Sequence, residues 1–259
     1  MRHNTLILLL IVLLTISCGK ESFDNVVDPG AASGTKSGSY ATMLPIGNRL
    51  YVVSKTQLTT FDVSTTSSPV QIDKKDVGFD IESLYYHDGL LLIGSANNMY
   101  IYRLADQGIP VRESVSQYNN IIGDDVCTRD PIVARGNIAY VTLSSVIVEC
   151  GWGRQINQLR VYDIDNLNTV KQLNIVNMSR PRGLGLGKNH LFVCDENDGL
   201  VVFNIENPAE PIRVNNYPGF KGYDLIVDND KLIVVSDSAL LQYDITDEED
   251  IRLLSKIQL

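Results

Sequence analysis

Short apolar runs rich in Val, Ile, Leu and Tyr recur along the chain, and each one follows a polar turn sequence. They are GNRLYVVS (47–54), DGLLLIGS (88–95), GNIAYVTL (136–143), KNHLFVCD (188–195) and NDKLIVVS (229–236). Runs of this length and composition, bounded by turn residues, predict buried strands rather than helices. The runs start 41, 48, 52 and 41 residues apart, a spacing typical of repeats that each form one small sheet.

Each apolar run is followed by an aromatic residue, a variable residue and an aliphatic residue. The aromatic residues are Phe61, Tyr102, Tyr162, Phe203 and Tyr243, and further aliphatic residues follow at Val70, Val111, Val170, Ile212 and Ile251. In three copies a proline precedes the later aliphatic residue, which suits the start of an edge strand. Four of the aromatics precede Asp or Asn, which can start a turn by hydrogen bonding to the backbone. Each repeat therefore predicts third and fourth strands.

Five repeats of four strands predict an all-β protein, a five-bladed β-propeller of four-stranded antiparallel blades spanning residues 38–259. The first innermost strand is expected near residues 39–46 and the last outer strand near residues 251–259. Since every repeat is complete, we expect the propeller to close by packing of the first blade against the last.

The fourth copy, GLVVFNIENPAEPIRV (199–214), and the first, FDVSTTSSPVQI (61–72), carry the clearest turn pattern. These residues resemble the LVIVD-repeat family of β-propeller proteins from Gram-negative bacteria, and the resemblance extends over about residues 38–257. It implies the propeller fold. It supplies no catalytic motif, so function must be argued from the site.

The N-terminus has the pattern of an export signal. Met1-Arg2-His3 precedes the apolar run LILLLIVLLTIS, and Cys18 follows. This arrangement resembles a bacterial lipobox, which implies a signal peptide over residues 1–17, a lipid on Cys18 and a flexible tether over residues 18–37. A plain signal peptide or membrane anchor is the alternative. Because Gly19 replaces the aspartate of inner-membrane retention, we expect an outer membrane lipoprotein on the periplasmic face or the cell surface.

The net charge of −9 limits the possible partners. Nucleic acid binding needs clustered Lys and Arg, and an acidic chain does not favour it. Electrostatic docking on anionic lipid is disfavoured for the same reason. Attachment to the membrane is therefore expected through the lipid on Cys18.

The segment SSVIVECGWGRQINQ (144–158) interrupts the third repeat, adding about twelve residues between Leu143 and Tyr162. The register assigns these residues to the link between the second and third strands, on the face where propellers usually bind ligands. Trp152 could stack on a sugar or fill space beneath its own loop, and Arg154 lies beside it. We predict a disulfide between Cys127 and Cys150, with free thiols as the alternative.

Charged residues recur where the innermost strands of four blades begin, at the expected channel mouth. They are Asp80, Glu82, Arg129, Asp130, Arg180, Arg182, Lys221 and Asp224. These side chains could form a binding ring or could pair with one another. The Arg180-Pro181-Arg182 sequence is the most suggestive part, because paired guanidinium groups suit a carboxylate or phosphate.

Catalytic and metal-binding motifs are not apparent in the sequence. It contains no GxSxG elbow, no phosphate-binding GxxxxGK[ST] and no CxxC spacing, so we predict no cofactor and no metal. The favoured hypothesis is a lipid-anchored binding module for a protein or glycan. One alternative is a carbohydrate-active hydrolase or lyase using Asp80 and Asp130. The other is a structural component of an envelope complex.

Overall fold

The computed structural model describes residues 42–118, 128–129, 131–145 and 156–259. All of them belong to one compact unit, residues 33–259. They form five antiparallel sheets, each of four strands in chain order, and the third sheet gains one further short strand. The predicted all-β propeller of four-stranded blades is confirmed. The predicted signal peptide (1–17) and tether (18–37) lie outside the described residues.

The strands follow the predicted repeats closely. The first sheet contains β1 (Met43–Ile46), β2 (Arg49–Val53), β3 (Gln57–Asp62) and β4 (Val70–Asp76). The second contains β5 (Ile81–His87), β6 (Leu90–Ser95), β7 (Asn98–Leu104) and β8 (Pro110–Gln117). The third contains β9 (Thr128–Arg129), β10 (Ile132–Arg135), β11 (Ile138–Ser145), β12 (Asn157–Asp163) and β13 (Lys171–Asn177).

The last two sheets have the same plan. The fourth contains β14 (Pro181–Leu186), β15 (His190–Asp195), β16 (Gly199–Asn204) and β17 (Ile212–Tyr217). The fifth contains β18 (Gly222–Asp228), β19 (Lys231–Ser236), β20 (Ala239–Asp244) and β21 (Arg252–Gln258). Two single-turn 3-10 helices, η2 (Asp106–Gly108) and η3 (Leu167–Thr169), join third to fourth strands in the second and third sheets.

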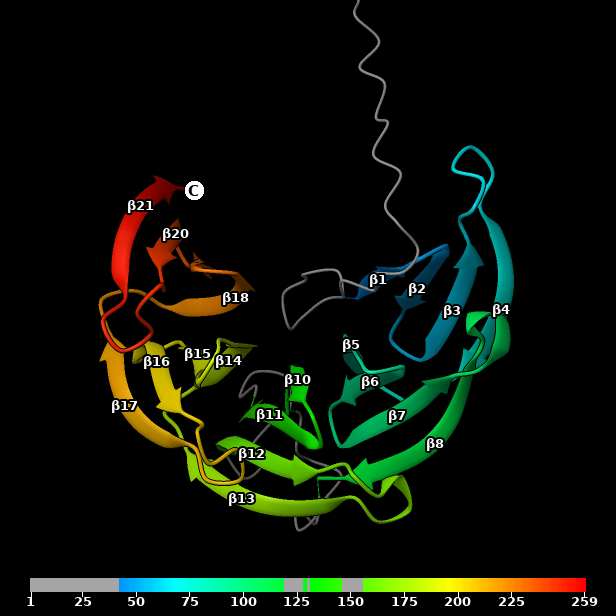
Figure 1. The fold of residues 1–259 in the computed structure, drawn as a ribbon, viewed down its shortest axis with the longest axis horizontal. Helices are drawn as coiled ribbons and strands as arrows, with labels where there is room; N and C mark the ends of the chain where they lie inside the picture. Colours follow the sequence, from blue (N-terminus) through cyan, green and yellow to red (C-terminus); the bar gives the residue numbers. More distant parts are fainter. Residues whose placement is uncertain (1–41, 119–127, 130, 146–155) are drawn as a thin grey trace, which may run out of the picture. The chain divides into compact units, whose positions relative to one another are not determined.

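Successive sheets pack face to face, with the innermost strands β1, β5, β10, β14 and β18 toward the centre and the outer strands at the rim (Figure 1). The core therefore consists of separate apolar layers, one between each pair of neighbouring sheets. Tyr102, Tyr162, Phe203 and Tyr243, the predicted aromatic positions, are buried in these layers. Each packs against the preceding sheet, which explains why the repeat needs a large side chain there.

The turn after each aromatic residue also follows the prediction. The side chains of Asp62, Asp163, Asn204 and Asp244 each accept a hydrogen bond from the backbone N–H two residues later. The second sheet, with Arg103 at this position, uses η2 for the same turn. A short polar side chain thus starts the link to the outer strand in four of the five sheets.

Side chains of the first, third and fourth sheets also bond to the turn between the third and fourth strands of the next sheet. Tyr51 donates to the carbonyl of Gly108 at 2.8 Å, and Tyr140 donates to the carbonyl of Pro208 at 2.8 Å. Between the fourth and fifth sheets, His190 Nδ1 lies 3.0 Å from Glu248 Oε2. The two tyrosine bonds satisfy turn carbonyls, and all three contacts help to fix the angle at which neighbouring sheets meet.

The expected packing of the first sheet against the last is not seen among the described residues. In the first four sheets, one cross-strand pair of the second and third strands is buried by the next sheet: Val53–Leu58, Gly94–Met99, Thr142–Leu159 and Cys194–Leu200. The equivalent pair in the fifth sheet is Val235, 37% exposed, and the half-buried Leu240. Phe61, the aromatic of the first sheet, is likewise only half-buried. The repeat predicts complementary faces, but the angle between sheets depends on the side chains packed between them.

Leu200 and Leu240 occupy the same position in the fourth and fifth repeats, but Leu200 is buried by the next sheet and Leu240 is partly exposed. We expect Leu200→Ala to lower the free energy of unfolding by about 2–5 kcal/mol, because it leaves a cavity between two sheets. Leu240→Ala should cost clearly less, since its side chain is partly exposed to water already. Urea unfolding of both variants measures the difference. Equal losses would mean that the end sheets are buried against each other in solution.

Candidate functional site

The start of the innermost strand is irregular in three sheets. The pairing with the second strand shifts between Ile81 and Ser83, between Pro181 and Leu184, and between Gly222 and Asp224. Such bulges turn one side chain away from the regular alternation of the sheet. The residues at these shifts include Glu82, Arg182 and Tyr223, so the same backbone feature presents an acid, a base and an aromatic.

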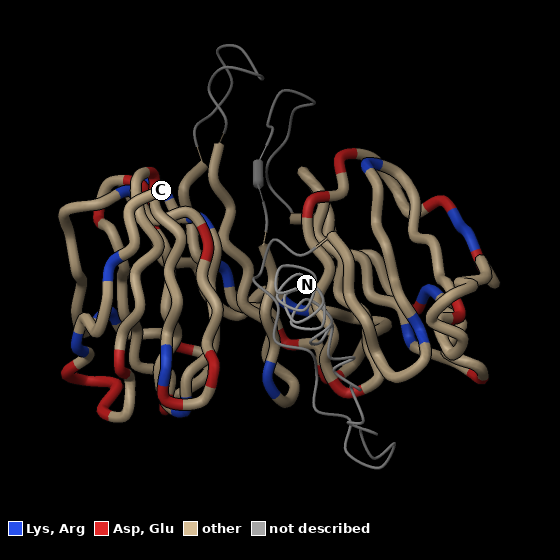
Figure 2. Tube along the Cα trace, turned by 90° about the horizontal axis from the view of Figure 1, so that it is seen from above, with Lys and Arg blue, Asp and Glu red and all other residues tan. Residues whose placement is uncertain are grey.

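These strand starts share one end of the sheets with the links between second and third strands, and we call this end the mouth face. The carbonyls of Asp80, Arg180 and Lys221 accept equivalent backbone hydrogen bonds there, so the three residues occupy corresponding positions. Acidic and basic residues are interspersed and gather mostly at the ends of the sheets (Figure 2). A mouth face of mixed charge does not select ligands of a single sign.

The paired arginines of the mouth face share an acid from their own sheet. Arg180 Nε lies 3.0 Å from Glu196 Oε2, and Arg182 Nε donates to Glu196 Oε1 at 2.6 Å. The Glu196 side chain is largely buried between them. The two arginines were expected to bind a carboxylate of a ligand, and in the structure they bind the carboxylate of Glu196 instead. An anionic ligand would have to compete with this internal carboxylate.

The neighbouring acids of the fourth and fifth sheets lie against the backbone of the fourth sheet. Asp195 is fully buried and accepts hydrogen bonds from the N–H groups of Arg180, Asn197 and Asp198 at 2.8–3.0 Å. Asp224 is half-buried against Gly183, where an added Cβ would lie 2.7 Å from the Asp224 Cα. The GLGLG sequence therefore permits close approach of two innermost strands.

Exposed aromatic side chains on the mouth face were not among the predicted site residues. Phe79 is 82% exposed in the link that enters the second sheet, and Tyr223 is 38% exposed at the bulge of the fifth sheet. Beside Phe79, Asp80 is exposed and has a positive φ of 49°. The signal in the sequence was GFD (78–80) and GFKGYD (219–224), which place aromatic residues in corresponding links.

Several predicted site residues lie outside the described part of the chain: Trp152, Arg154, Asp130, Cys18, Cys127 and Cys150. Arg129 is described only as backbone, in β9, where it pairs with Ser144 of β11. The insertion falls in the predicted link, because β11 ends at Ser145 and β12 begins at Asn157. The enzymatic pair of Asp80 and Asp130 stays a prediction for the same reason.

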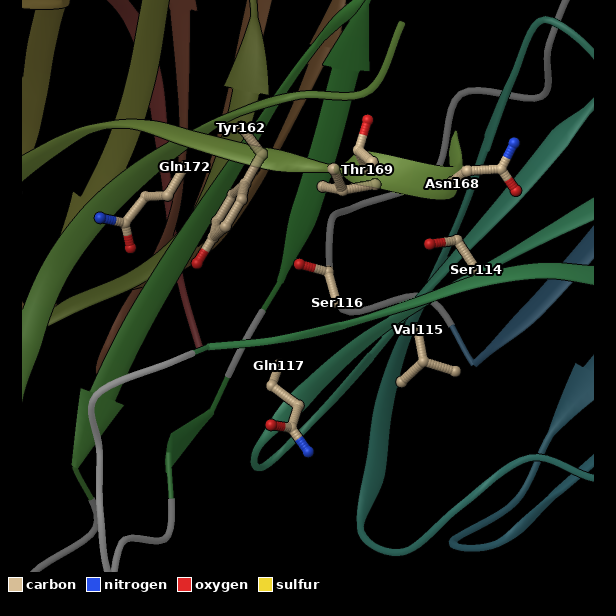
Figure 3. A pocket seen from close by; sticks show the side chains of 9 residues that line it. Ser114, Val115, Ser116, Gln117, Tyr162, Asn168, Thr169 and Gln172 are labelled. Carbon is tan, nitrogen blue, oxygen red and sulfur yellow. The ribbon is translucent and has the colours of Figure 1, made fainter. Parts of the chain in front are cut away.

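A hollow of about 330 Å³ lies at the outer rim, between β8 and η3 at the junction of the second and third sheets (Figure 3). Its lining residues are almost all neutral and polar: Ser114, Val115, Ser116, Gln117, Tyr162, Asn168, Thr169, Val170 and Gln172. Hydroxyl and amide groups can both donate and accept hydrogen bonds. The hollow was not predicted, because its lining residues come from separate repeats.

Two kinds of site are not found in the part of the chain that the structure describes. It contains no helix long and apolar enough to cross a membrane. It also contains no cluster of three His, Cys, Asp or Glu side chains placed to bind a metal ion.

The cysteines lead to a labelling test of the predicted disulfide. Burial, with smaller contributions from Asp224 and Asp195, raises the pKa of the Cys194 thiol well above its ordinary value, so Cys194 should not react in the native protein. We expect one labelled cysteine, Cys194, when the mature protein is unfolded without reductant and alkylated, and three after reduction. Mass spectrometry of tryptic peptides identifies them. Labelling of Cys127 and Cys150 without reductant would contradict the Cys127–Cys150 bond.

The fourth sheet matches a known repeat model. Residues 184–218 match the LVIVD repeat, and this range contains the copy that most resembled that repeat. The match spans β14 from its fourth residue through β17. No curated protein is similar to the chain by sequence.

Solved structures of similar fold include three bacterial proteins. A protein from Lactobacillus plantarum shares 16% identity with a TM-score of 0.61, over 81% of this chain and 67% of that one. The periplasmic gluconolactonase PpgL from Pseudomonas aeruginosa shares 14% identity with a TM-score of 0.61, over 82% and 68%. BamB from Moraxella catarrhalis shares 12% identity with a TM-score of 0.56, over 84% and 63%. At these identities the likeness is one of fold alone.

Proposed function

We propose that this β-propeller with an LVIVD repeat is a lipid-anchored interaction module of the bacterial cell envelope, and that it binds a protein through its mouth face. The exposure of Phe79 and Tyr223 on that face is the observation that carries the proposal. Aromatic side chains of this kind are enriched at the centres of protein interfaces, where they bury a large area with little loss of conformational entropy.

The charged groups of the mouth face are arranged for recognition. Asp80 and Lys221 are exposed beside the two aromatics, as in the polar rim of an interface. Glu196 is committed to Arg180 and Arg182, and Asp195 to backbone N–H groups. Acids held in this way stabilise the strand starts, which keeps the surface rigid and lowers the entropic cost of binding.

Fold alone does not choose between binding and catalysis, because similar propellers include a gluconolactonase as well as BamB. The choice rests on the side chains of the mouth face. The predicted insertion around Trp152 and Arg154 would extend the same surface, since it joins β11 to β12 at that end of the sheets.

The anchor is the second part of the proposal. A lipid on Cys18 would hold the protein at the outer membrane, on the periplasmic face or the cell surface. A Gly- and Ser-rich tether of about 20 residues has a reach of roughly 25 Å. Such a tether leaves the mouth face free to turn toward a partner.

The end sheets favour a second candidate, a structural component of an envelope complex. Met43 of the first sheet and Val235 and Ile257 of the fifth are exposed apolar side chains. Apolar side chains that gather on the surface of a soluble domain often mark contacts with other proteins. In this candidate the partner contacts the end sheets instead of the mouth face.

Substitution of the two aromatics tests the first candidate. We expect Phe79→Ala combined with Tyr223→Ala to abolish crosslinking of the partner captured by the wild-type protein on intact cells. The control, Leu173→Ala, removes an exposed apolar side chain from the outer strand β13 and should leave capture unchanged. Capture that survives the double substitution but is lost with Val235→Asp would instead favour the structural component.

The lipid on Cys18 has its own test. We expect Cys18→Ser to abolish incorporation of a labelled fatty acid and to move the protein from the membrane fraction to the soluble fraction. The described sheets should be unaffected, so the melting temperature of the domain is the control. A variant that stays in the membrane fraction would contradict the lipid anchor.

A further inference from the structure

The outer strand of each sheet directs two side chains toward the next sheet. The register places these pairs at corresponding positions: Asp73 and Lys75, Ser114 and Ser116, Asn174 and Val176, and Asn215 and Tyr217. We call the contact between two successive sheets a junction. At each of the four junctions, these two side chains lie at the outer rim, beyond the apolar layer, and we compare the contacts that they make there. Only in the second sheet are both side chains as small as serine.

At three junctions these side chains fill the space or bond across it. Lys75 donates to the carbonyl of Pro110 at 2.6 Å, and Asn174 donates to the carbonyl of Ala209 at 3.3 Å. At the fourth junction the rings of Tyr217 and Tyr243 lie 6.1 Å apart between centroids. Ser114 and Ser116 are too short to span the second junction, and the 330 Å³ hollow lies there. A volume of this size is at the lower end of small-molecule sites.

The hydroxyl of Tyr162 points into this hollow. Figure 3 shows the ring reaching from β12 between Gln172 on one side and Ser116 and Gln117 on the other. Tyr162 is 2% exposed, and among the described residues its hydroxyl interacts with the Arg160 side chain but forms no hydrogen bond of ordinary geometry. A buried hydroxyl without a partner costs about 1–3 kcal/mol. At the next junction the corresponding aromatic is Phe203, which has no hydroxyl to satisfy.

A buried positive charge lies near the hydroxyl. Arg160 is 4% exposed; its Nε donates to Gln158 Oε1 at 3.0 Å, and its Nη1 has no hydrogen-bond partner among the described residues. Burial raises the pKa of Tyr162, while the nearby Arg160 acts in the opposite direction. No ion pair of Arg160 with a carboxylate is found among the described residues. A buried guanidinium without a counter-ion is unfavourable, so an anion in the hollow would be stabilised.

We infer that this hollow binds a small hydroxylated organic anion, of the sugar acid class. The carboxylate of the ligand accepts from the Tyr162 hydroxyl, close to the charge of Arg160. The ligand hydroxyls exchange hydrogen bonds with Ser114, Ser116 and the amide of Gln172. The lining contains no acidic side chain that would repel the carboxylate. This site lies at the outer rim, shares no residue with the surface of Phe79 and Tyr223, and does not depend on the proposed protein partner.

Isothermal titration calorimetry of the full mature protein in detergent tests the site, with glucuronate, glucose and inorganic phosphate as probes. We expect glucuronate to bind at least tenfold more tightly than either glucose or phosphate. Tyr162→Phe should weaken glucuronate binding about tenfold, the loss of one hydrogen bond to a charged group. Ser116→Val should also weaken glucuronate binding about tenfold, because it removes a hydroxyl that bonds the ligand and narrows the hollow.

Both substitutions use a residue found at the same position of another repeat, Phe203 and Val176, so both should fold. Melting temperatures close to that of the wild type verify this. The matched control is Ser255→Val, which corresponds to Ser114 in the last sheet and should leave binding unchanged. The site would be overturned by absence of glucuronate binding, by glucose or phosphate binding equally well, or by wild-type affinity in the Ser116→Val protein. Capture of a protein partner should be unchanged in that variant.

Discussion

The burial of one apolar layer between each pair of successive sheets is the interaction on which the rest of this structure depends. A four-stranded sheet cannot bury both of its faces alone, so each repeat is stable only when its neighbours cover it. The aromatic residue before the turn extends each layer, and the bonds made by Tyr51, Tyr140 and His190 fix the angle between sheets. Every surface that could carry function is positioned by these layers.

The candidate sites are places where one repeat departs from the others. Ser114 and Ser116 occur together only in the second sheet, whereas each other sheet has at least one larger side chain at the corresponding positions, and Arg160 stands where the fourth and fifth sheets have Val201 and Leu241. The bulge at Arg182 interrupts a regular pairing in the same way. Because the repeats are built alike, the other copies show what a purely structural residue would be at each position. A residue that departs from this pattern lowers the stability of the fold, and ligand binding at that residue is the most direct reason for keeping it.

The two end sheets show the limit of the repeat. Each interior sheet is covered on both faces, while the fifth leaves Val235 and Leu240 partly exposed and the first leaves Phe61 half-buried. Repeat proteins commonly use polar capping units at their ends, and the end sheets described here have apolar positions instead. The same residues that stabilise the interior therefore create a surface suited to a partner.

The sequence by itself determined the number of repeats, the strands within each repeat, the aromatic layer positions, the turn residues such as Asp62, and the place of the insertion after Ser145. These features depend on local periodicity and turn chemistry, which a single chain segment encodes. Tertiary structure alone decided that Arg180 and Arg182 share Glu196, that Phe79 is exposed, and that Val235 of the fifth sheet stays partly exposed within the described residues. It also decided that two serines leave a hollow beside Tyr162. These outcomes depend on side chains brought together from different repeats and on the angles between sheets, and neither is encoded in the spacing of residues along the chain.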